Sequence, residues 1–253
     1  MRLTIVGCSG SFPGPQSPAS CYLVQAAYEG RQWSIVLDLG NGALGMLQRH
    51  VDPRTLDAVV LSHLHPDHFL DLCGLYVMQR YQPEGRTRSI PVWGPSDTPQ
   101  RVALAYYGHP FKPVEEFEFA PITDGAEVTI GPFRIRAWRV NHPVEAYGYR
   151  IEADGKTLAL TGDTDTCPAL SPLMHGADLV LADTAFVDGR DALRDIHMTG
   201  SRVAAAALAA GGVRRLMLTH MPVWNDPEVC RAQAAALWPG DVELARQGLV
   251  IDI

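Results

Sequence analysis

A run of metal-binding residue types placed directly after an apolar stretch constrains this chain more than any other segment. Residues 56–61 are mostly aliphatic, and residues 62–68 read Ser-His-Leu-His-Pro-Asp-His. A short apolar run of this kind is typical of a buried strand. The polar run therefore leaves the end of a strand, which is where loops on a rigid sheet build functional sites.

The spacing inside this run suits two metal ions. His63 and His65 alternate as the chain leaves the strand, so two imidazoles can point at one ion. Asp67 and His68 follow a proline turn and can reach a second ion. The alternatives are solvated loop histidines or an affinity tag, but a tag is terminal and is not interrupted by an aspartate. We therefore predict a metal site.

Four side chains cannot complete two metal sites, and three isolated residues further along the chain supply the rest. His142, Asp163 and His220 each follow a stretch that reads as a strand, so each is expected at a strand end. A carboxylate placed between two cations can bridge them, which makes Asp163 the natural shared ligand. The predicted ligands are His63, His65 and His142 for the first ion, Asp67, His68 and His220 for the second, and Asp163 for both.

These residues and several shorter motifs carry a resemblance to a known family. The motifs are Gly-Cys-Ser-Gly-Ser-Phe-Pro at 7–13, the His-x-His-x-Asp-His run, Tyr-Gly-Tyr at 147–149 after His142, Thr-Gly-Asp-Thr at 161–164, and His197 ahead of Thr219-His220. The chain resembles the metallo-β-lactamase superfamily, more narrowly its ribonuclease Z-like branch, and nearest the short bacterial cyclic-nucleotide phosphodiesterases termed atypical class II. The resemblance implies an α/β fold, a four-layer αββα sandwich of two mixed sheets, with a dimetal hydrolase site at the sheet edges.

Three residues are expected to act in catalysis. His197 has no place among the seven ligands, yet it stands where the resemblance implies an extra histidine, and it can give a proton to the leaving oxygen. Asp183 ends a hydrophobic strand, where an unpaired carboxylate is costly, so we expect it to orient His197, although relatives tend to carry the longer glutamate there. Asp67 can orient the hydroxide that two metal ions generate for attack. The alternatives are a surface or core position for His197 and a helix cap or turn for Asp183.

Composition favours one enzyme domain over residues 1–253. A chain of this length with 47% hydrophobic residues can bury a large core. The N-terminus shows no signal-peptide pattern and no apolar run reaches membrane-spanning length, so we expect a cytoplasmic protein with no membrane partner. The five cysteines are scattered without a Cys-x-x-Cys pair, which disfavours a disulfide framework. Zinc is the expected metal, although the same donors accept manganese, iron or cobalt. The resemblance to the family also implies a homodimer.

Two features favour a small phosphodiester over a tRNA precursor. The net charge is −7 and no basic tract stands out, whereas a long polyanion demands a basic footprint. Only residues 143–162 separate His142 from Asp163, whereas the resemblance implies a protruding tRNA-gripping arm at this place in true ribonuclease Z enzymes. We therefore predict hydrolysis of a 3′,5′-cyclic nucleotide such as cyclic AMP, with a tRNA 3′-processing endonuclease as the alternative. A 2′,3′-cyclic substrate stays open.

Other functions share parts of this pattern. Lactonases and arylsulfatase-like enzymes fit the same spacing, and a noncatalytic metal-binding scaffold of the same fold is a further alternative. The complete ligand set together with His197 disfavours the scaffold, which has no chemical need for it. Phe12, Trp93, Phe186 and Trp224 lie near the predicted site loops, and we expect Trp224 first among them to stack on a nucleobase.

Hydrophobic periodicity predicts the order of strands and helices. Strands are expected at 3–6, 22–26, 33–38, 58–61, 90–93, 128–130, 133–140, 148–152, 157–161, 179–182, 215–219 and 249–251. Helices are expected at 43–49, 69–79, 201–210 and 227–237. The second of these helices begins directly after His68, so its N-terminal dipole is expected to face an anion bound at the metal site.

Overall fold

The structure, a computed structural model, describes residues 1–83, 85 and 88–253. The described chain forms two seven-stranded sheets. In spatial order, the first sheet consists of β14 (Val250–Asp252), β1 (Arg2–Gly7), β2 (Cys21–Tyr28), β3 (Arg31–Leu37), β4 (Ala58–Val60), β5 (Ile90–Gly94) and β6 (Phe117–Pro121). The second consists of β13 (Val242–Leu244), β12 (Leu216–Thr219), β11 (Leu179–Asp183), β10 (Lys156–Leu160), β9 (Tyr147–Ala153), β8 (Phe133–Arg139) and β7 (Glu127–Ile130).

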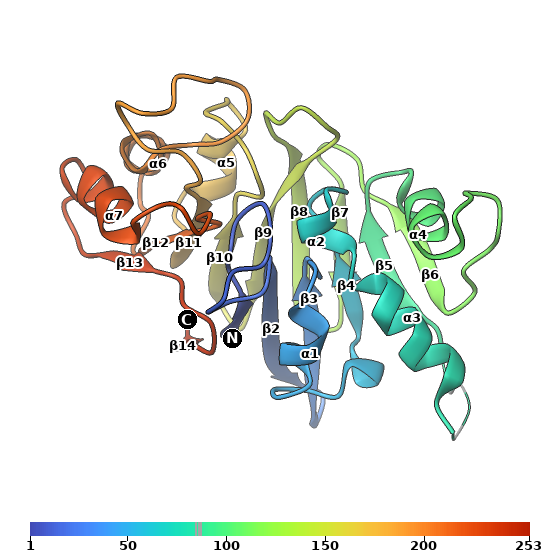
Figure 1. Ribbon diagram of the computed structural model, residues 1–253. Coiled ribbons are helices and arrows are strands. Elements are labelled where there is room, and N and C mark those ends of the chain that lie inside the picture. The colour runs from blue at the N-terminus through green and yellow to red at the C-terminus, as the bar shows by residue number, and fades with distance from the viewer. Residues whose placement is uncertain (84, 86–87) are drawn as a thin grey trace.

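Each sheet is antiparallel in one half and parallel in the other. Strands β14 to β3 pair antiparallel and β3 to β6 pair in parallel. In the second sheet, β7 to β10 pair antiparallel and β10 to β13 pair in parallel. The two chain ends lie side by side because β1 and β14 are neighbours (Figure 1). The expected mixed sheets are therefore confirmed.

Helices cover the outer face of each sheet (Figure 1). The first sheet carries α1 (Ala43–Leu47), α2 (Pro66–Phe69), α3 (Leu72–Tyr81) and α4 (Thr98–Tyr107), with a 3₁₀ turn at Pro53–Thr55. The second carries α5 (Leu170–Met174), α6 (Gly200–Ala210) and α7 (Pro227–Ala235). Within the part of the chain that is described, every helix is too short or too polar to cross a lipid bilayer.

Alternation of side chains along the strands builds three hydrophobic cores. In β3, Ile35 and Leu37 face the core between the two sheets, whereas Val36 faces the helices. In β11, Leu181 faces the same central core and Val180 packs under the helices on the other side. Strands buried on both faces read as nearly continuous apolar runs, as in the sequence. The four-layer αββα sandwich is therefore confirmed.

The element predictions hold with one correction. Every predicted strand is present to within two residues at each end, whereas β6, β13, α4 and α5 had no specific prediction. The helix predicted at 69–79 is wrong at its start, because α2 begins at Pro66 and α3 begins only at Leu72. Proline is well suited to the first position of a helix. Between the two helices, the Asp71 carboxylate accepts a hydrogen bond from the Leu44 backbone N–H at 2.7 Å.

This correction removes the expected dipole effect. Asp67 and His68 lie inside the four-residue helix α2, and the longer helix α3 starts four positions beyond His68. Its N-terminus therefore does not follow the metal-binding run directly.

Hydrogen bonds join the two sheets at the edge where the metal-binding run leaves β4. The buried Tyr149 hydroxyl on β9 donates to the Leu61 carbonyl at 2.7 Å. The Tyr147 backbone N–H donates to the Ser62 carbonyl at 2.9 Å. These bonds fix the end of β4 against the second sheet before the chain reaches His63.

We predict that Tyr149→Phe lowers the free energy of unfolding by about 1–2 kcal/mol, because the Leu61 carbonyl loses its buried donor. The measurement is urea denaturation, and the matched control is Tyr28→Phe on a ring that is 45% exposed. Equal stability of the two variants would show that the bond between the sheets contributes nothing.

Candidate metal centre

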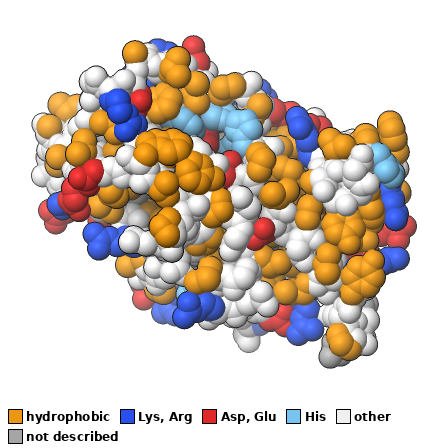
Figure 2. All heavy atoms as spheres, in the orientation of Figure 1, with side chains coloured by type: hydrophobic (Ala, Val, Ile, Leu, Met, Phe, Trp, Pro, Cys, Tyr) orange, Lys and Arg blue, Asp and Glu red, His pale blue; other side chains and the backbone are white. Residues whose placement is uncertain are grey.

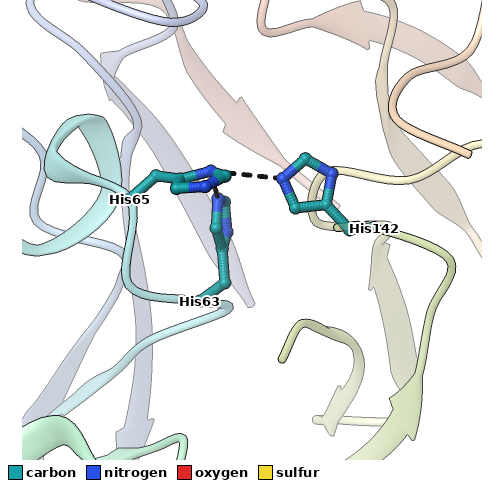
Figure 3. A group of neighbouring side chains, drawn as sticks. All are labelled: His63, His65 and His142. Atoms are coloured by element: carbon teal, nitrogen blue, oxygen red, sulfur yellow. Dashed lines mark hydrogen bonds between the residues drawn. The ribbon is translucent and has the colours of Figure 1, made fainter. Parts of the chain in front are cut away.

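Three histidines from two distant segments form the first donor cluster (Figure 3). His63 and His65 follow β4, and His142 follows β8. The His65 Nδ1 lies 3.0 Å from the His63 Nε2 and 3.2 Å from the His142 Nε2. Figure 3 shows the three rings turned toward one another. Three ring nitrogens that converge in this way are a donor set suited to a zinc-like ion.

A second cluster lies beside the first and contains carboxylates. It consists of Asp67, His68, Asp163 and His220, all of them buried. The His220 Nε2 lies 3.1 Å from the Asp67 Oδ2 and 3.2 Å from the His68 Nε2. The cluster draws on both sheets, because Asp67 and His68 lie in α2 whereas Asp163 follows β10 and His220 follows β12.

Asp163 connects the two clusters through a single oxygen. Its Oδ2 lies 3.3 Å from the Nε2 of both His68 and His220. The same Oδ2 lies 3.7 Å from the Nε2 of His63, which belongs to the first cluster. The structure therefore brings all seven expected ligands together and places the expected bridging residue between the two groups. Metal binding by these residues stays a prediction.

Four of the histidines form a hydrogen bond through Nδ1, the ring nitrogen that points away from the clusters, and this bond fixes the orientation of each ring. The Nδ1 partners are Ser62 Oγ for His63 at 3.1 Å, Asp38 Oδ2 for His68 at 2.8 Å, the Ile196 carbonyl for His142 at 3.0 Å and Asp183 Oδ1 for His220 at 3.3 Å. A ring that donates through Nδ1 keeps the Nε2 lone pair for the cluster. The donor set therefore fits divalent metal ions, which bind neutral imidazole nitrogens and displace the proton from a ring that carries one.

Asp38 is a site residue that the sequence reasoning missed. It follows β3 with a left-handed φ of 58° and is buried. Its Oδ1 accepts a hydrogen bond from the Ser62 N–H at 2.6 Å, and its Oδ2 accepts one from the Ser62 hydroxyl at 2.8 Å as well as from His68. The available signal was a carboxylate at the end of an apolar strand, the same signal that singled out Asp183.

The two clusters differ in their electrostatics. In the first cluster, burial lowers the pKa values of His63, His65 and His142, which keeps these rings neutral. In the second, burial opposes charge, but nearby carboxylates outweigh it and raise the pKa of His220 to about 10. The pKa of Asp163 is held well below its ordinary value because the charges of His220 and His68 outweigh its burial. The ionised carboxylates of this cluster therefore favour a cation between them.

His197 and Asp183 form the pair that the sequence predicts. The His197 Nδ1 donates to the Asp183 Oδ2 at 2.8 Å, and the same oxygen accepts the Thr164 N–H at 3.0 Å. The His197 ring packs between both clusters, with its centroid 5.5 Å from that of His142 and 5.4 Å from that of His220. Asp183 therefore contacts His197 and His220 at once, and the catalytic roles stay predictions.

Asp165, which looks ordinary in the sequence, anchors the loop that carries His197. Its carboxylate is buried and accepts hydrogen bonds from the Asp195 N–H at 2.9 Å and from the Arg194 guanidinium. Arg202 reaches both the Asp165 Oδ1 and the His197 carbonyl, each at 3.4 Å. This role escaped prediction because it depends on contacts between residues roughly thirty positions apart, which no local pattern reveals.

The expected aromatic residues take different positions. Phe12 and Trp224 are exposed and pack on each other, with ring centroids 5.2 Å apart. They lie beside the second cluster, since the neighbouring Ser11 N–H donates to the His220 Nε2 at 3.3 Å. Trp93 packs against the central core, so it is poorly placed to stack on a substrate. The Phe186 ring forms a T-shaped contact with the His197 ring, with centroids 5.2 Å apart.

We predict that Asp38→Asn lowers zinc affinity roughly 10- to 100-fold, because the His68 ring loses the carboxylate that orients it. The measurement is competition for zinc with a chromophoric chelator. The control is Asp57→Asn, a buried carboxylate directly before β4 that accepts the Ser34 N–H at 2.8 Å. An equal loss of affinity in both variants would mean that only general stability had changed.

Comparison with known proteins agrees with this geometry. The family described as Beta-lactamase superfamily domain matches residues 34–221. The uncharacterized protein ML1173 of Mycobacterium leprae (strain TN) is 39% identical over 100% of this chain and 89% of its own length. The probable metallo-hydrolase YhfI of Bacillus subtilis (strain 168) is 30% identical over 99% of both chains. A ribonuclease Z of Myxococcus xanthus (strain DK1622) is 26% identical over 100% of this chain and 98% of its own length.

Solved structures agree as well. The crystal structure of YhfI from Bacillus subtilis superimposes with a TM-score of 0.87 and 28% identity over 99% of both chains. The human short-form tRNase Z has the same fold, with a TM-score of 0.77 and 20% identity over 100% of this chain and 99% of its own. The family match covers most of the sequence. The histidine and aspartate motifs that suggested the family supply the side chains of the two donor clusters. The chain therefore belongs to the β-lactamase superfamily.

Proposed function

We propose that this protein, a metal-dependent hydrolase, cleaves a small phosphodiester, in particular a 3′,5′-cyclic nucleotide such as cyclic AMP. The observation that carries the proposal is the meeting of two donor clusters at the Asp163 Oδ2. When bound, two divalent ions supply a water of lowered pKa and offset the negative charge of a phosphoryl group. Zinc as the native metal, a homodimer and a cytoplasmic location complete the proposal as expectations carried over from the sequence.

The proposal divides the ligands into the two donor clusters. His63, His65 and His142 would hold one ion, Asp67, His68 and His220 would hold the other, and Asp163 would serve both. Asp67, whose Oδ2 lies 3.1 Å from the His220 Nε2, is also proposed to orient the attacking water by accepting its hydrogen bond.

His197 is proposed to serve the leaving group. Its Nδ1 is held by Asp183, so the Nε2 is the ring nitrogen left for a substrate oxygen. The ring lies between the two clusters, within reach of a phosphoryl group placed over them. A proton donated from this position would neutralise the departing oxygen.

The β-hairpin between His142 and Asp163 favours a small substrate over a tRNA. Strands β9 and β10 occupy this interval and are joined by the tight turn Asp154–Gly155. The hairpin belongs to the second sheet and leaves no segment to form the arm that the resemblance implies for tRNA cleavage. The ribonuclease Z relative keeps tRNA 3′-processing as the second candidate.

The test compares turnover of purified, metal-quantified protein on cyclic AMP and on a pre-tRNA with a 3′ trailer. We expect cyclic AMP hydrolysis and an intact pre-tRNA. His197→Ala is expected to lower kcat on cyclic AMP by roughly 10²- to 10⁴-fold, the usual contribution of a general acid.

The matched control is His109→Ala, an exposed histidine beyond α4. Trailer cleavage by the wild type would contradict the argument from the β9–β10 hairpin. Unchanged cyclic AMP turnover in His197→Ala would remove His197 from the mechanism. A metal-loaded protein inactive on both substrates would contradict the phosphodiesterase proposal and move the search for the substrate to lactones, thioesters and sulfate esters.

A further inference from the structure

A cavity of about 670 Å³ adjoins the first donor cluster. It lies between α2, α4 and the loop that follows β8, and His65 is part of its wall. Its apolar lining includes Leu64, Leu70, Leu104 and Val144. One expected ligand, His65, therefore forms part of the cavity wall, and the rest of the lining extends away from it over mainly apolar side chains.

The apolar wall is open to solvent, which is costly unless something covers it. Leu104 is 45% exposed on α4, and Leu64, Leu70 and Val144 are only partly buried. Figure 2 shows hydrophobic side chains gathered beside the histidines on this face of the molecule. The volume falls within the range of about 300–1,000 Å³ typical of small-molecule sites.

Carboxylates lie at the rim of the same cavity. The Asp97 Oδ2 pairs at 3.2 Å with the Nε of Arg101, which also lines the cavity, and the Glu145 Oε1 accepts the Tyr147 hydroxyl at 2.7 Å. Among the described residues, these contacts use one oxygen of each carboxylate, so the other oxygen can accept a hydrogen bond from a ligand. An apolar wall with hydrogen-bond acceptors at its edge suits a planar heteroaromatic ring that carries an amino group.

We infer that this cavity binds the nucleobase of the substrate and thereby determines its specificity. The inference rests on the proposed function, because the phosphoryl group must lie over the metal centre for the base to reach the cavity past His65. A phosphoryl group needs charged partners, which the clusters supply, and has no use for a leucine-lined space of this volume. The occupant is therefore the apolar part of the ester, an aminopurine in size and edge chemistry.

The position differs from the stacking expected at Trp224. The Phe12 and Trp224 rings contact each other on the His220 side, and both stay exposed. The cavity on the His65 side encloses its occupant between α2, α4 and the loop after β8 and adds hydrogen-bond acceptors, which suits an aromatic base better than an open pair of rings.

The test measures KM and kcat on cyclic AMP and on methyl riboside 3′,5′-cyclic phosphate, which has the same reacting ester but no base. Leu104→Asp is expected to raise KM for cyclic AMP about tenfold or more and to leave KM for the base-free ester unchanged. Leu104→Met, which keeps the apolar surface, is expected to retain the wild-type KM. The matched control is Leu208→Asp on α6, where the leucine is 47% exposed.

Several results would overturn the inference. One is an unchanged KM for cyclic AMP in Leu104→Asp, and another is an equal rise for both esters. A rise in KM for cyclic AMP in Trp224→Ala, with none in Leu104→Asp, would place the base on the His220 side. In each of these cases hydrolysis of the base-free ester by the wild type would leave the proposed function standing. No turnover of either ester at full metal occupancy would remove the proposed function and this inference together.

Discussion

The convergence of strand ends from two sheets on one buried oxygen, the Asp163 Oδ2, is the constraint on which the centre depends. His68 approaches this oxygen from the first sheet and His220 from the second. Neither sheet alone holds a complete donor set, so the site forms only when the sheets pack. The bonds from Tyr149 and Tyr147 to the end of β4 hold the sheets in this register.

His68 and His220 are oriented by hydrogen bonds to buried carboxylates outside the ligand set. One of these carboxylates also positions His197, the proposed catalytic residue. Asp183 is shared between His220, an expected ligand, and His197, the expected proton donor. Asp165 then ties the His197 loop to the residues that follow Asp163. Asp183 therefore links the orientation of an expected ligand to the placement of His197, and Asp165 supports the loop that carries His197.

The sequence identified those parts of the site that carry a local pattern. His63 to His68 form one short run, and His142, Asp163 and His220 each follow a strand, so periodicity and ligand chemistry were sufficient. Asp165 was missed because its partners lie far away in the chain, whereas Asp38 carried the same strand-end signal as Asp183 and was assigned only to a strand. The start of α3 was misplaced because Asp71, bound to the Leu44 N–H, separates it from α2. The edge strands β6 and β13 span only five and three residues, which is too short for their alternation to distinguish them from loops.

The most direct test of the two-cluster centre is anomalous diffraction at the zinc absorption edge from crystals of the zinc-loaded protein. The account predicts two peaks, one among His63, His65 and His142 and one among Asp67, His68 and His220, with Asp163 between them. A single peak, or peaks that avoid Asp163, would contradict the assignment of a shared carboxylate and with it the basis of the proposed chemistry.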